Sequence, residues 1–346
     1  MDLPPGPTRA GGRVLAVMLL ACARMASAQP AASSPSFAGR GPLETREEWL
    51  LAQPHLTLPA LSPDPLPDGA TRVRLDGDWG SDFGWRWRVP GDLDDLRFIV
   101  DGEHRTMGVE MRRGATPSLT VGARIPLHWR GGGILDGVID WWHSVVHLPG
   151  NARDRFPRGR FRVETQDGGE RAVTWDSRQG IGLGRAELSA QWALSRSPSG
   201  WRTAAVGRVG LPTGTGPFAS RGLDAGIQLL AAHRLGSAFD VYLGAGGTLF
   251  GQHVVDGVDY VTLRPHGFVV FEWRPTWRWS LMAEASGAGR LVRNFDGYPS
   301  RHVYLKLGSK IDLARGWRIE GGFLEGATSQ QATTDFGIFA GVSREF

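Results

Sequence analysis

The chain has 346 residues, of which 41% are hydrophobic and 21% are charged, and its formal net charge is +4. Glycine is abundant, at 49 residues, and there are 14 tryptophans, a composition that favours many strands with tight turns over a helical enzyme. No basic tract is present, so the sequence gives no indication of nucleic-acid binding. After the N-terminal region, no stretch reaches the roughly 18 uninterrupted apolar residues of a membrane helix.

Residues 1–28 predict a secretory signal peptide. Arg9 and Arg13 precede a short apolar core, and a small-x-small sequence predicts cleavage after Ala28. Lipoprotein-type cleavage at Cys22 is the alternative. Because Cys22 is the only cysteine, a chain cleaved after Ala28 has no thiol and no disulfide.

Residues 29–70 form a distinct leader rich in proline, alanine and serine. Its prolines deny this stretch regular strand pairing. We predict an extended periplasmic leader, and the sequence leaves its position open, with a plug inside the barrel as one option. A disordered leader is the alternative.

From Thr71 onward, apolar and polar residues alternate with a period of two, which indicates half-buried strands. In the clearest case, 302–313, Val303 and Leu305 lie on the face opposite to Tyr304 and Lys306. An exported chain without membrane helices spans a bilayer only as a closed barrel, with apolar side chains toward lipid and polar ones toward the lumen. We therefore predict an all-β, transmembrane, antiparallel up-and-down β-barrel over 71–346. Its approximately twelve strands are predicted at 71–79, 97–112, 118–129, 181–194, 201–211, 222–234, 239–250, 260–273, 278–288, 302–313, 317–325 and 334–346.

The connections alternate between long and short, as in bacterial barrels with short periplasmic turns and longer outer loops. Five tryptophans flank the short turns, which indicates an aromatic girdle at one membrane interface. The alternative is a soluble β-sandwich with tryptophan in its core. The five are Trp192, Trp201, Trp273, Trp277 and Trp317.

The predicted register places charged side chains of both signs in the lumen. If they pair, they form a plug; if arginine and lysine remain unpaired, they favour anionic solutes. The lumen-lining candidates are Arg124, Glu187, Arg202, Arg208, Arg264, His266, Glu272, Glu284, Lys306, Lys310, Arg318 and Glu320.

The last strand resembles the assembly signal of outer-membrane barrels, with a terminal aromatic residue, alternating apolar residues and an upstream glycine. This resemblance implies the barrel-assembly machinery as a partner during biogenesis. Arg344 departs from the signal, which usually has an apolar residue there. The residues that carry it are Phe336, Ile338, Gly341, Val342 and Phe346.

One amphipathic helix is predicted at about 133–147, within the long 130–180 loop. It either lies on the membrane interface or, as we favour, packs on the barrel. Its apolar face comprises Ile134, Leu135, Val138, Ile139, Trp142 and Val145. Its polar face carries weak candidates for metal ligands, for which a solvated surface is the simpler explanation; they are Asp136, Asp140, His143 and His147.

This loop also resembles one found in a family of uncharacterised proteobacterial proteins, a domain of unknown function that is expected to form an outer-membrane barrel. The similarity lies in 131–139, in Trp142-His143 and in 148–154, together with Gly41-Pro42-Leu43. It implies a fold and a location in the outer membrane, but no activity and no functional residues.

A passive pore for small solutes is the first functional hypothesis, with outer-membrane lipid as surroundings and the solute unidentified. The alternative is a structural or interaction barrel with a sealed lumen. The third is a barrel hydrolase, for which the inward candidates are Ser280, His302, His266, Glu272 and Glu284. No nucleotide-binding or nucleophile-elbow motif is found, so we expect no enzyme, no catalytic residue and no cofactor.

Overall fold

The computed structural model describes residues 39–88, 92, 96–146, 153–167, 170–175, 177–197, 200–327 and 333–346. The predicted signal peptide, with both alternative cleavage sites, lies outside the described residues, as do residues 29–38 of the leader. His147 and most of the 148–154 motif also lie outside them.

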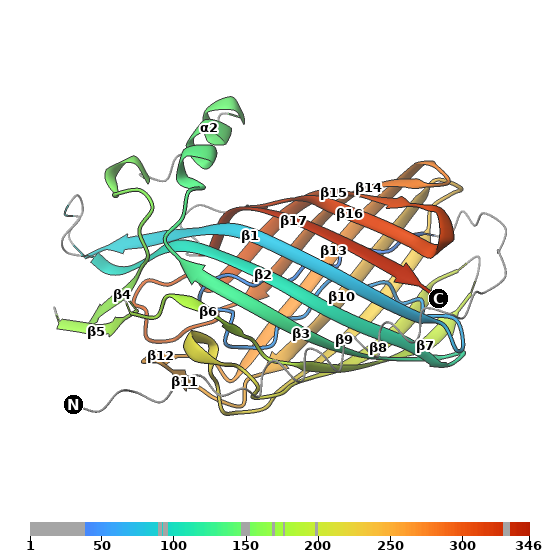
Figure 1. Ribbon diagram of the computed structural model, residues 1–346, viewed down its shortest axis with the longest axis horizontal. Coiled ribbons are helices and arrows are strands. Elements are labelled where there is room, and N and C mark those ends of the chain that lie inside the picture. The colour runs from blue at the N-terminus through green and yellow to red at the C-terminus, as the bar shows by residue number, and fades with distance from the viewer. Residues whose placement is uncertain are drawn as a thin grey trace, which may run out of the picture.

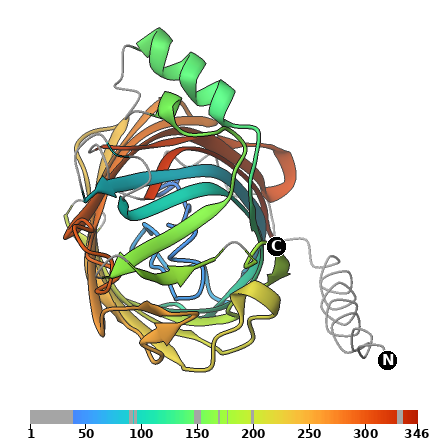
Figure 2. The same ribbon diagram turned by 90° about the vertical axis from the view of Figure 1, so that its left-hand side faces the viewer.

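The described strands form a closed antiparallel barrel of twelve strands, as the sequence predicts (Figures 1 and 2). The barrel closes because β1 pairs with β2 on one side and with β17 on the other. At the seam, the backbone N–H groups of Thr71 and Phe346 each donate to the other residue's carbonyl oxygen, at 3.2 and 2.9 Å. The barrel strands are β1 (Thr71–Trp87), β2 (Leu96–Thr116), β3 (Leu119–Gly131), β7 (Glu187–Arg196), β8 (Arg202–Gly210), β9 (Asp224–Arg234), β10 (Phe239–Leu249), β13 (Leu263–Thr276), β14 (Trp279–Gly289), β15 (Arg301–Asp312), β16 (Trp317–Gly326) and β17 (Thr333–Glu345).

The two ends of the barrel differ, and we call them the short-turn end and the long-loop end. The C-terminus lies at the short-turn end, on the right in Figure 1. All five tryptophans that the sequence assigns to the short turns have exposed side chains there. A ring of exposed indoles at one rim fits a membrane interface, because the indole is apolar and its N–H needs a polar partner.

The first two strands are longer than predicted and project beyond the rest of the wall. The predicted strand 71–79 continues as far as Trp87, and its partner ends at Thr116 rather than at 112. Charged residues in this extension hide its alternation. Its aromatic residues pack on a loop at the long-loop end, where Phe83 and Trp85 contact Phe156.

The predicted strand 181–194 is divided in the structure into β6 (Gly180–Leu183) and β7. Arg185 lies in the break, and its guanidinium donates to the carbonyl oxygens of Pro54 at 2.6 Å and of Gly222 at 2.6 Å. These bonds require Arg185 to turn inward, which interrupts the pairing with β3.

Two short hairpins at the long-loop end are absent from the sequence prediction. They are β4 (Arg162–Asp167) with β5 (Glu170–Thr174), and β11 (Val254–Val255) with β12 (Val258–Asp259). Three 3-10 turns occur at η2 (Arg153–Arg155), η3 (Gly216–Phe218) and η4 (Ala314–Gly316). Within the part of the chain that the structure describes, no helix has the length and apolarity to cross a membrane.

The loop helix α2 (Asp136–Val146) is shorter than the predicted 133–147; it begins outside the wall at the long-loop end and projects away from the strands (Figure 1). Leu135 and Ile139 are buried against Phe336, with Trp79 and Phe323 beside them. The side chains of Trp142 and His143 lie outside the described residues. Among the described side chains of this region, Ile134, Val138, Trp141 and Val145 are exposed.

The glycines before α2 allow the chain to pass close to the wall and to a neighbouring loop. A Cβ atom on Gly132 would lie 2.1 Å from the carbonyl oxygen of Gly159, and one on Gly133 would lie 1.9 Å from a carboxylate oxygen of Glu103. Glu103 accepts hydrogen bonds from the backbone N–H of Leu135 at 2.5 Å and from Trp79 Nε1 at 2.7 Å. The glycine-rich motif thus fixes where the helix begins.

We expect Gly132→Ala to detach α2 from the wall, because the new methyl group would clash with a backbone carbonyl that cannot rotate away. The measurement is the rate of limited proteolysis within residues 131–160 of the folded barrel, which should rise. Gly137→Ala is the matched control, since a Cβ atom there meets nothing within 4 Å and alanine favours a helix by roughly 1 kcal/mol over glycine. Equal proteolysis of the two variants would contradict this role.

Candidate functional site: the occupied lumen

The leader forms a hairpin inside the barrel, visible as the blue segment within the ring of strands in Figure 2. We call residues 39–62 the leader hairpin. Arg40 lies at the short-turn end, where its Nε is 2.6 Å from Asp312 at the end of β15. The hairpin tip lies toward the long-loop end, where the backbone N–H of Leu50 donates to Asp82 at 2.8 Å. The chain then returns, and the N–H of Leu66 donates to Thr120 near the start of β3.

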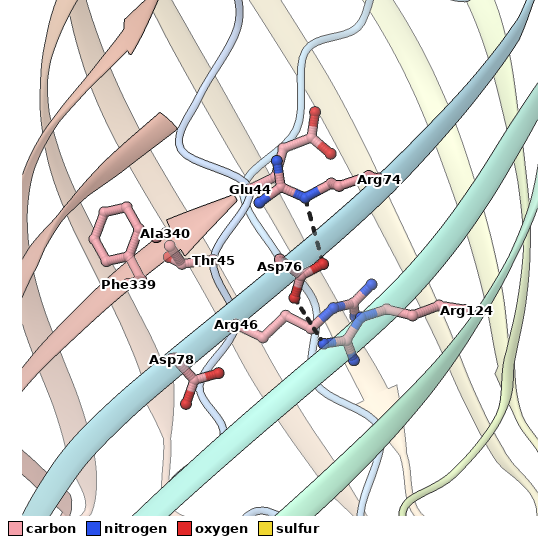
Figure 3. Close-up of a pocket in the computed structure, with 10 residues that line it drawn as sticks. Glu44, Thr45, Arg46, Arg74, Asp76, Asp78, Arg124, Phe339 and Ala340 are labelled. Atoms are coloured by element: carbon pink, nitrogen blue, oxygen red, sulfur yellow. Dashed lines mark hydrogen bonds and ion pairs between the residues drawn. The ribbon is translucent and has the colours of Figure 1, made fainter. Parts of the chain in front are cut away.

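The hairpin fills the lumen rather than resting at its mouth. Residues 40–61 are buried, apart from Glu44, which is half-buried. A cavity between the hairpin and the wall, lined by Glu44, Arg46, Arg74 and Asp76, has a volume of only about 10 Å³ (Figure 3). That is about the space one water molecule needs.

The ascending limb is held by ion pairs that reach different strands. Glu44 lies 2.7 Å from Arg72 on β1 and 3.0 Å from Arg112 on β2. Because these pairs are shielded from water on several sides, removing one partner would leave a buried charge uncompensated. The next three charged residues pair across the lumen: Arg46 with Glu187 on β7 at 2.9 Å, Glu47 with Arg264 on β13 at 2.9 Å, and Glu48 with Arg124 on β3 at 3.2 Å.

The descending limb is held mainly through its backbone carbonyl groups. Gln228 donates to the carbonyl oxygen of Pro59 at 3.2 Å, and Gln191 donates to that of Ser62 at 3.0 Å. Proline has no N–H but keeps a carbonyl acceptor. A proline-rich, extended segment therefore suits a position where side chains of the wall supply the donors.

An apolar cluster on the inner wall is covered by the hairpin. Leu43, Ala60 and Leu61 pack against inward side chains of β8, β9, β10, β13 and β14. The same strands also carry buried charges, such as Arg264 and Glu272 on β13, so the hairpin covers apolar and charged groups of one part of the wall.

The long-loop end is closed over the tip of the hairpin. Trp49, Leu50 and Leu51 are buried in an apolar cluster with side chains of the β4–β5 hairpin, the β11–β12 hairpin and the 290–300 loop. Tyr260 and Tyr298 lie in this cap, and burial raises the pKa of both phenols above its ordinary value. Both phenols therefore stay neutral in this largely apolar cap, on which the guanidinium of Arg130 stacks at Trp175.

The structure places nine of the twelve lumen candidates in buried positions, whereas Arg202, His266 and Arg318 are half-buried. Several pair with one another: Lys306 with Glu284 at 2.7 Å, Lys310 with Glu320 at 3.2 Å, and Arg208 with Glu187 at 3.1 Å. Arg202 pairs with Asp64 of the leader at 2.8 Å, and Arg318 pairs with Asp312 at 2.6 Å. Glu272 accepts from the backbone N–H of Arg40 at 2.9 Å.

Sequence reasoning missed the leader's own charges and several charges of the wall. Arg74 and Asp76 lie on the inward face of β1, whereas Leu75 between them faces outward. The alternation of the sequence therefore already indicates that these two charged residues point into the lumen. No periodic pattern marks the leader charges, because their partners are more than a hundred residues away in several cases. The missed residues include Arg40, Glu44, Arg46, Glu47, Glu48, Arg74, Asp76, Asp82, Glu110, Arg112, Arg185, Asp224, Asp240 and Arg274.

The hydrolase candidates do not assemble into a nucleophile and base. The hydroxyl of Ser280 donates to Glu272 at 2.5 Å and accepts from Arg40 at 2.7 Å. On β14, Ser280 is paired with Lys310, whereas His302 is paired with Ala288. Eight residues of strand separate the two positions, about 26 Å at 3.3 Å per residue.

The metal-ligand candidates whose side chains are described are engaged by arginines. Asp136 pairs with Arg153, and Asp140 pairs with Arg158. Asp136 also accepts from the backbone N–H of Gly159 at 2.8 Å, which ties the helix start to the next loop. Over the described ranges, no group of three or more His, Cys, Asp or Glu side chains is placed to hold a metal ion.

The C-terminal strand shows why its signal contains an arginine. The guanidinium of Arg344 lies 5.4 Å from the ring centroid of Trp317 and 4.5 Å from that of Phe346. An arginine in such contacts reaches an interface while its stem covers apolar surface. Of the signal's other residues, Ile338 faces outward, Phe336 packs against Leu135 and Ile139, and Val342 borders an outer groove. Gly341 leaves room for Arg74, because a Cβ atom at position 341 would lie 2.7 Å from Arg74 Nη2.

We expect Glu47→Gln to loosen the hairpin, because Arg264 would lose its carboxylate partner in the lumen. The measurement is the rate at which a maleimide labels a cysteine placed at the buried Ala60, with Cys22 replaced by serine. The rate should rise by about tenfold or more, since breaking a buried ion pair costs about 3–5 kcal/mol. Asp140→Asn, which removes an exposed ion pair on α2, is the control, and an equal rise in the control would refute this expectation.

Comparisons with known proteins agree with this architecture. No curated protein matches the sequence. Among solved structures, the COG4313 outer membrane channel from Pseudomonas putida F1 is similar over 82% of this chain and 97% of its own, with a TM-score of 0.56 and 10% identity, which shows a shared fold. The Pseudomonas putida toluene transporter TodX is similar over 81% of this chain and 90% of its own, with a TM-score of 0.40 and 14% identity. Residues 15–346 match the family described as "Protein of unknown function (DUF3187)", and the chain therefore belongs to that family.

Proposed function

We propose that this protein is an outer-membrane channel for small polar solutes whose resting state is closed by the leader hairpin. In this proposal the short-turn end faces the periplasm and the long-loop end faces the outside. Conduction requires the hairpin to move within the lumen or to withdraw toward the periplasm.

The observation that carries the proposal is the manner in which the hairpin is held. Glu44, Arg46, Glu47 and Glu48 each pair with a side chain of the wall. Charged groups lose little when they exchange such partners for water, whereas apolar groups lose the free energy of burial. A segment held largely by ion pairs can therefore leave and return more readily than one held by apolar packing alone.

The charges that the hairpin covers predict the selectivity of the open state. When Glu44 and Glu47 leave, Arg72 and Arg264 lose their carboxylate partners. Arg112 and Arg124 also lose a leader glutamate, but they keep Glu110 and Asp76 of the wall. Departure of Arg46 uncovers Glu187, but that carboxylate keeps Arg208 as a partner. The hairpin carries two arginines and three glutamates, a net charge of −1, so its departure leaves the lumen more positive by one charge and favours anions.

A sealed scaffold barrel is the second candidate, and the apolar cap favours it. Trp49 and Leu50 at the tip are buried among large side chains of the outer loops. Such a cluster resists opening, because each large apolar side chain exposed to water costs roughly 1.5–3 kcal/mol. In this alternative the hairpin is a permanent core for the barrel.

Planar-bilayer recording of the purified full-length protein separates the two candidates. We expect the wild type to be closed for most of the recording, with brief openings. The triple substitution Glu44→Gln, Glu47→Gln and Glu48→Gln should raise the open fraction by about tenfold or more, because three buried ion pairs are lost. The reversal potential in a salt gradient should show a preference for anions.

The control for this experiment is Asp140→Asn, which lies on α2 outside the barrel and should behave as the wild type does. Absence of any conductance step in the wild type and in the triple variant, both verified as folded barrels, would refute the channel and leave the sealed scaffold.

A further inference from the structure

The outer surface of the wall carries a groove along the seam between β1 and β17. Its volume is about 750 Å³, within the roughly 300–1,000 Å³ of sites that hold small molecules. Gly77 and Ala340, which are paired across the seam, form its floor with little side chain. Larger apolar side chains border it, namely Leu75, Met107, Ile319, Ile338 and Val342.

Arg105 lies at the end of the groove toward the long loops. Its guanidinium carbon is 4.4 Å from the ring centroid of Trp79 and 4.3 Å from that of Trp129, and its side chain is 44% exposed. The three residues lie side by side on β1, β2 and β3. Because tryptophan marks the headgroup level of a bilayer, Arg105 is a cation at that level on the lipid-facing surface.

The carboxylate nearest to Arg105 is already engaged. Glu103 lies 3.7 Å from Arg105, but it is buried and accepts hydrogen bonds from Trp79 and from the start of α2. A guanidinium has five N–H donors. Contact with one such carboxylate leaves donors for a second anion on the exposed side.

Helix α2 begins beside the same end of the groove, because Leu135 and Ile139 cluster with Trp79, which also lines the groove. Leu135 and Ile139 hold it against the wall, while a second apolar stripe on the helix is exposed. The stripe consists of Ile134, Val138, Trp141 and Val145, at spacings of four, three and four residues. A helix of this kind beside a membrane-spanning wall has an apolar face suited to the boundary between headgroups and acyl chains.

We propose that this groove binds one lipid of the outer leaflet, with an acyl chain over Gly77 and Ala340 and a phosphate-bearing headgroup at Arg105. A guanidinium binds phosphate oxygens through paired, charge-assisted hydrogen bonds. The small residues of the floor make room for a chain.

Native mass spectrometry of the full-length protein in mild detergent tests this, with dimyristoyl phosphatidylglycerol as the probe. The protein should bind it, and dimyristoylglycerol, which lacks the phosphate, should bind about tenfold more weakly. Inorganic phosphate alone should neither bind nor displace the lipid. Arg105→Gln should remove the preference for the phosphate-bearing lipid, and Ala340→Leu should weaken binding of both lipids by filling the floor.

Two matched controls accompany these variants. Arg278→Gln removes a guanidinium stacked on Trp277 at the opposite rim, and Ala283→Leu enlarges an exposed alanine elsewhere on the wall. Both should bind lipid as the wild type does. Equal binding of lipid by the groove variants and by the controls would overturn the proposal. A species of two chains that Ala340→Leu abolishes would also overturn it, because the groove would then be an interface between copies. The readout is independent of conductance, so this proposal and the channel can fail separately.

Discussion

The pairing of charges inside the lumen is the constraint on which the rest of this structure depends. A closed strand array leaves lipid on one side, so its ionic side chains must lie on the other, and there each needs a partner. The strands supply some of these partners to one another, as Lys306 and Glu284 do. The remainder come from a short leader in which Arg46, Glu47 and Glu48 follow one another and pair with three separate strands. The interior thus contains several groups of ion pairs, with contributions from the leader and from the wall.

The outer surface of the wall carries apolar side chains toward lipid, and α2 covers one part of that surface. The helix begins where Glu103 accepts the N–H of Leu135, and its buried stripe covers Trp79 and Phe336 on a surface that otherwise faces lipid. The glycines at 132 and 133 permit this close approach. The motif that suggested a family resemblance therefore has a structural reason, which is to hold one helix against the barrel.

Much of the fold could be predicted because alternation in a membrane strand is enforced on both faces. Lipid demands apolar residues outside and the lumen tolerates charge inside, so strands such as 302–313 are recognisable without any partner. The prediction was incomplete where another rule operated. Phe83 and Trp85 pack on a loop instead of lipid, Arg185 interrupts a strand to bond distant carbonyl groups, and the two small hairpins are stabilised by the cap over the lumen. The leader's pairing partners, such as Arg264 for Glu47, lie too far along the chain for any local pattern to identify them.

The path of the leader has a consequence for biogenesis. Both limbs of the hairpin leave the lumen by the same opening, and the returning limb runs directly into the first residue of β1. Over the described residues, the leader enters and leaves the lumen by one opening, so the wall can close first and the hairpin can be inserted afterwards as a loop. The barrel can therefore close around water before the leader hairpin enters. The covalent connection to β1 keeps the hairpin at high local concentration near the lumen throughout.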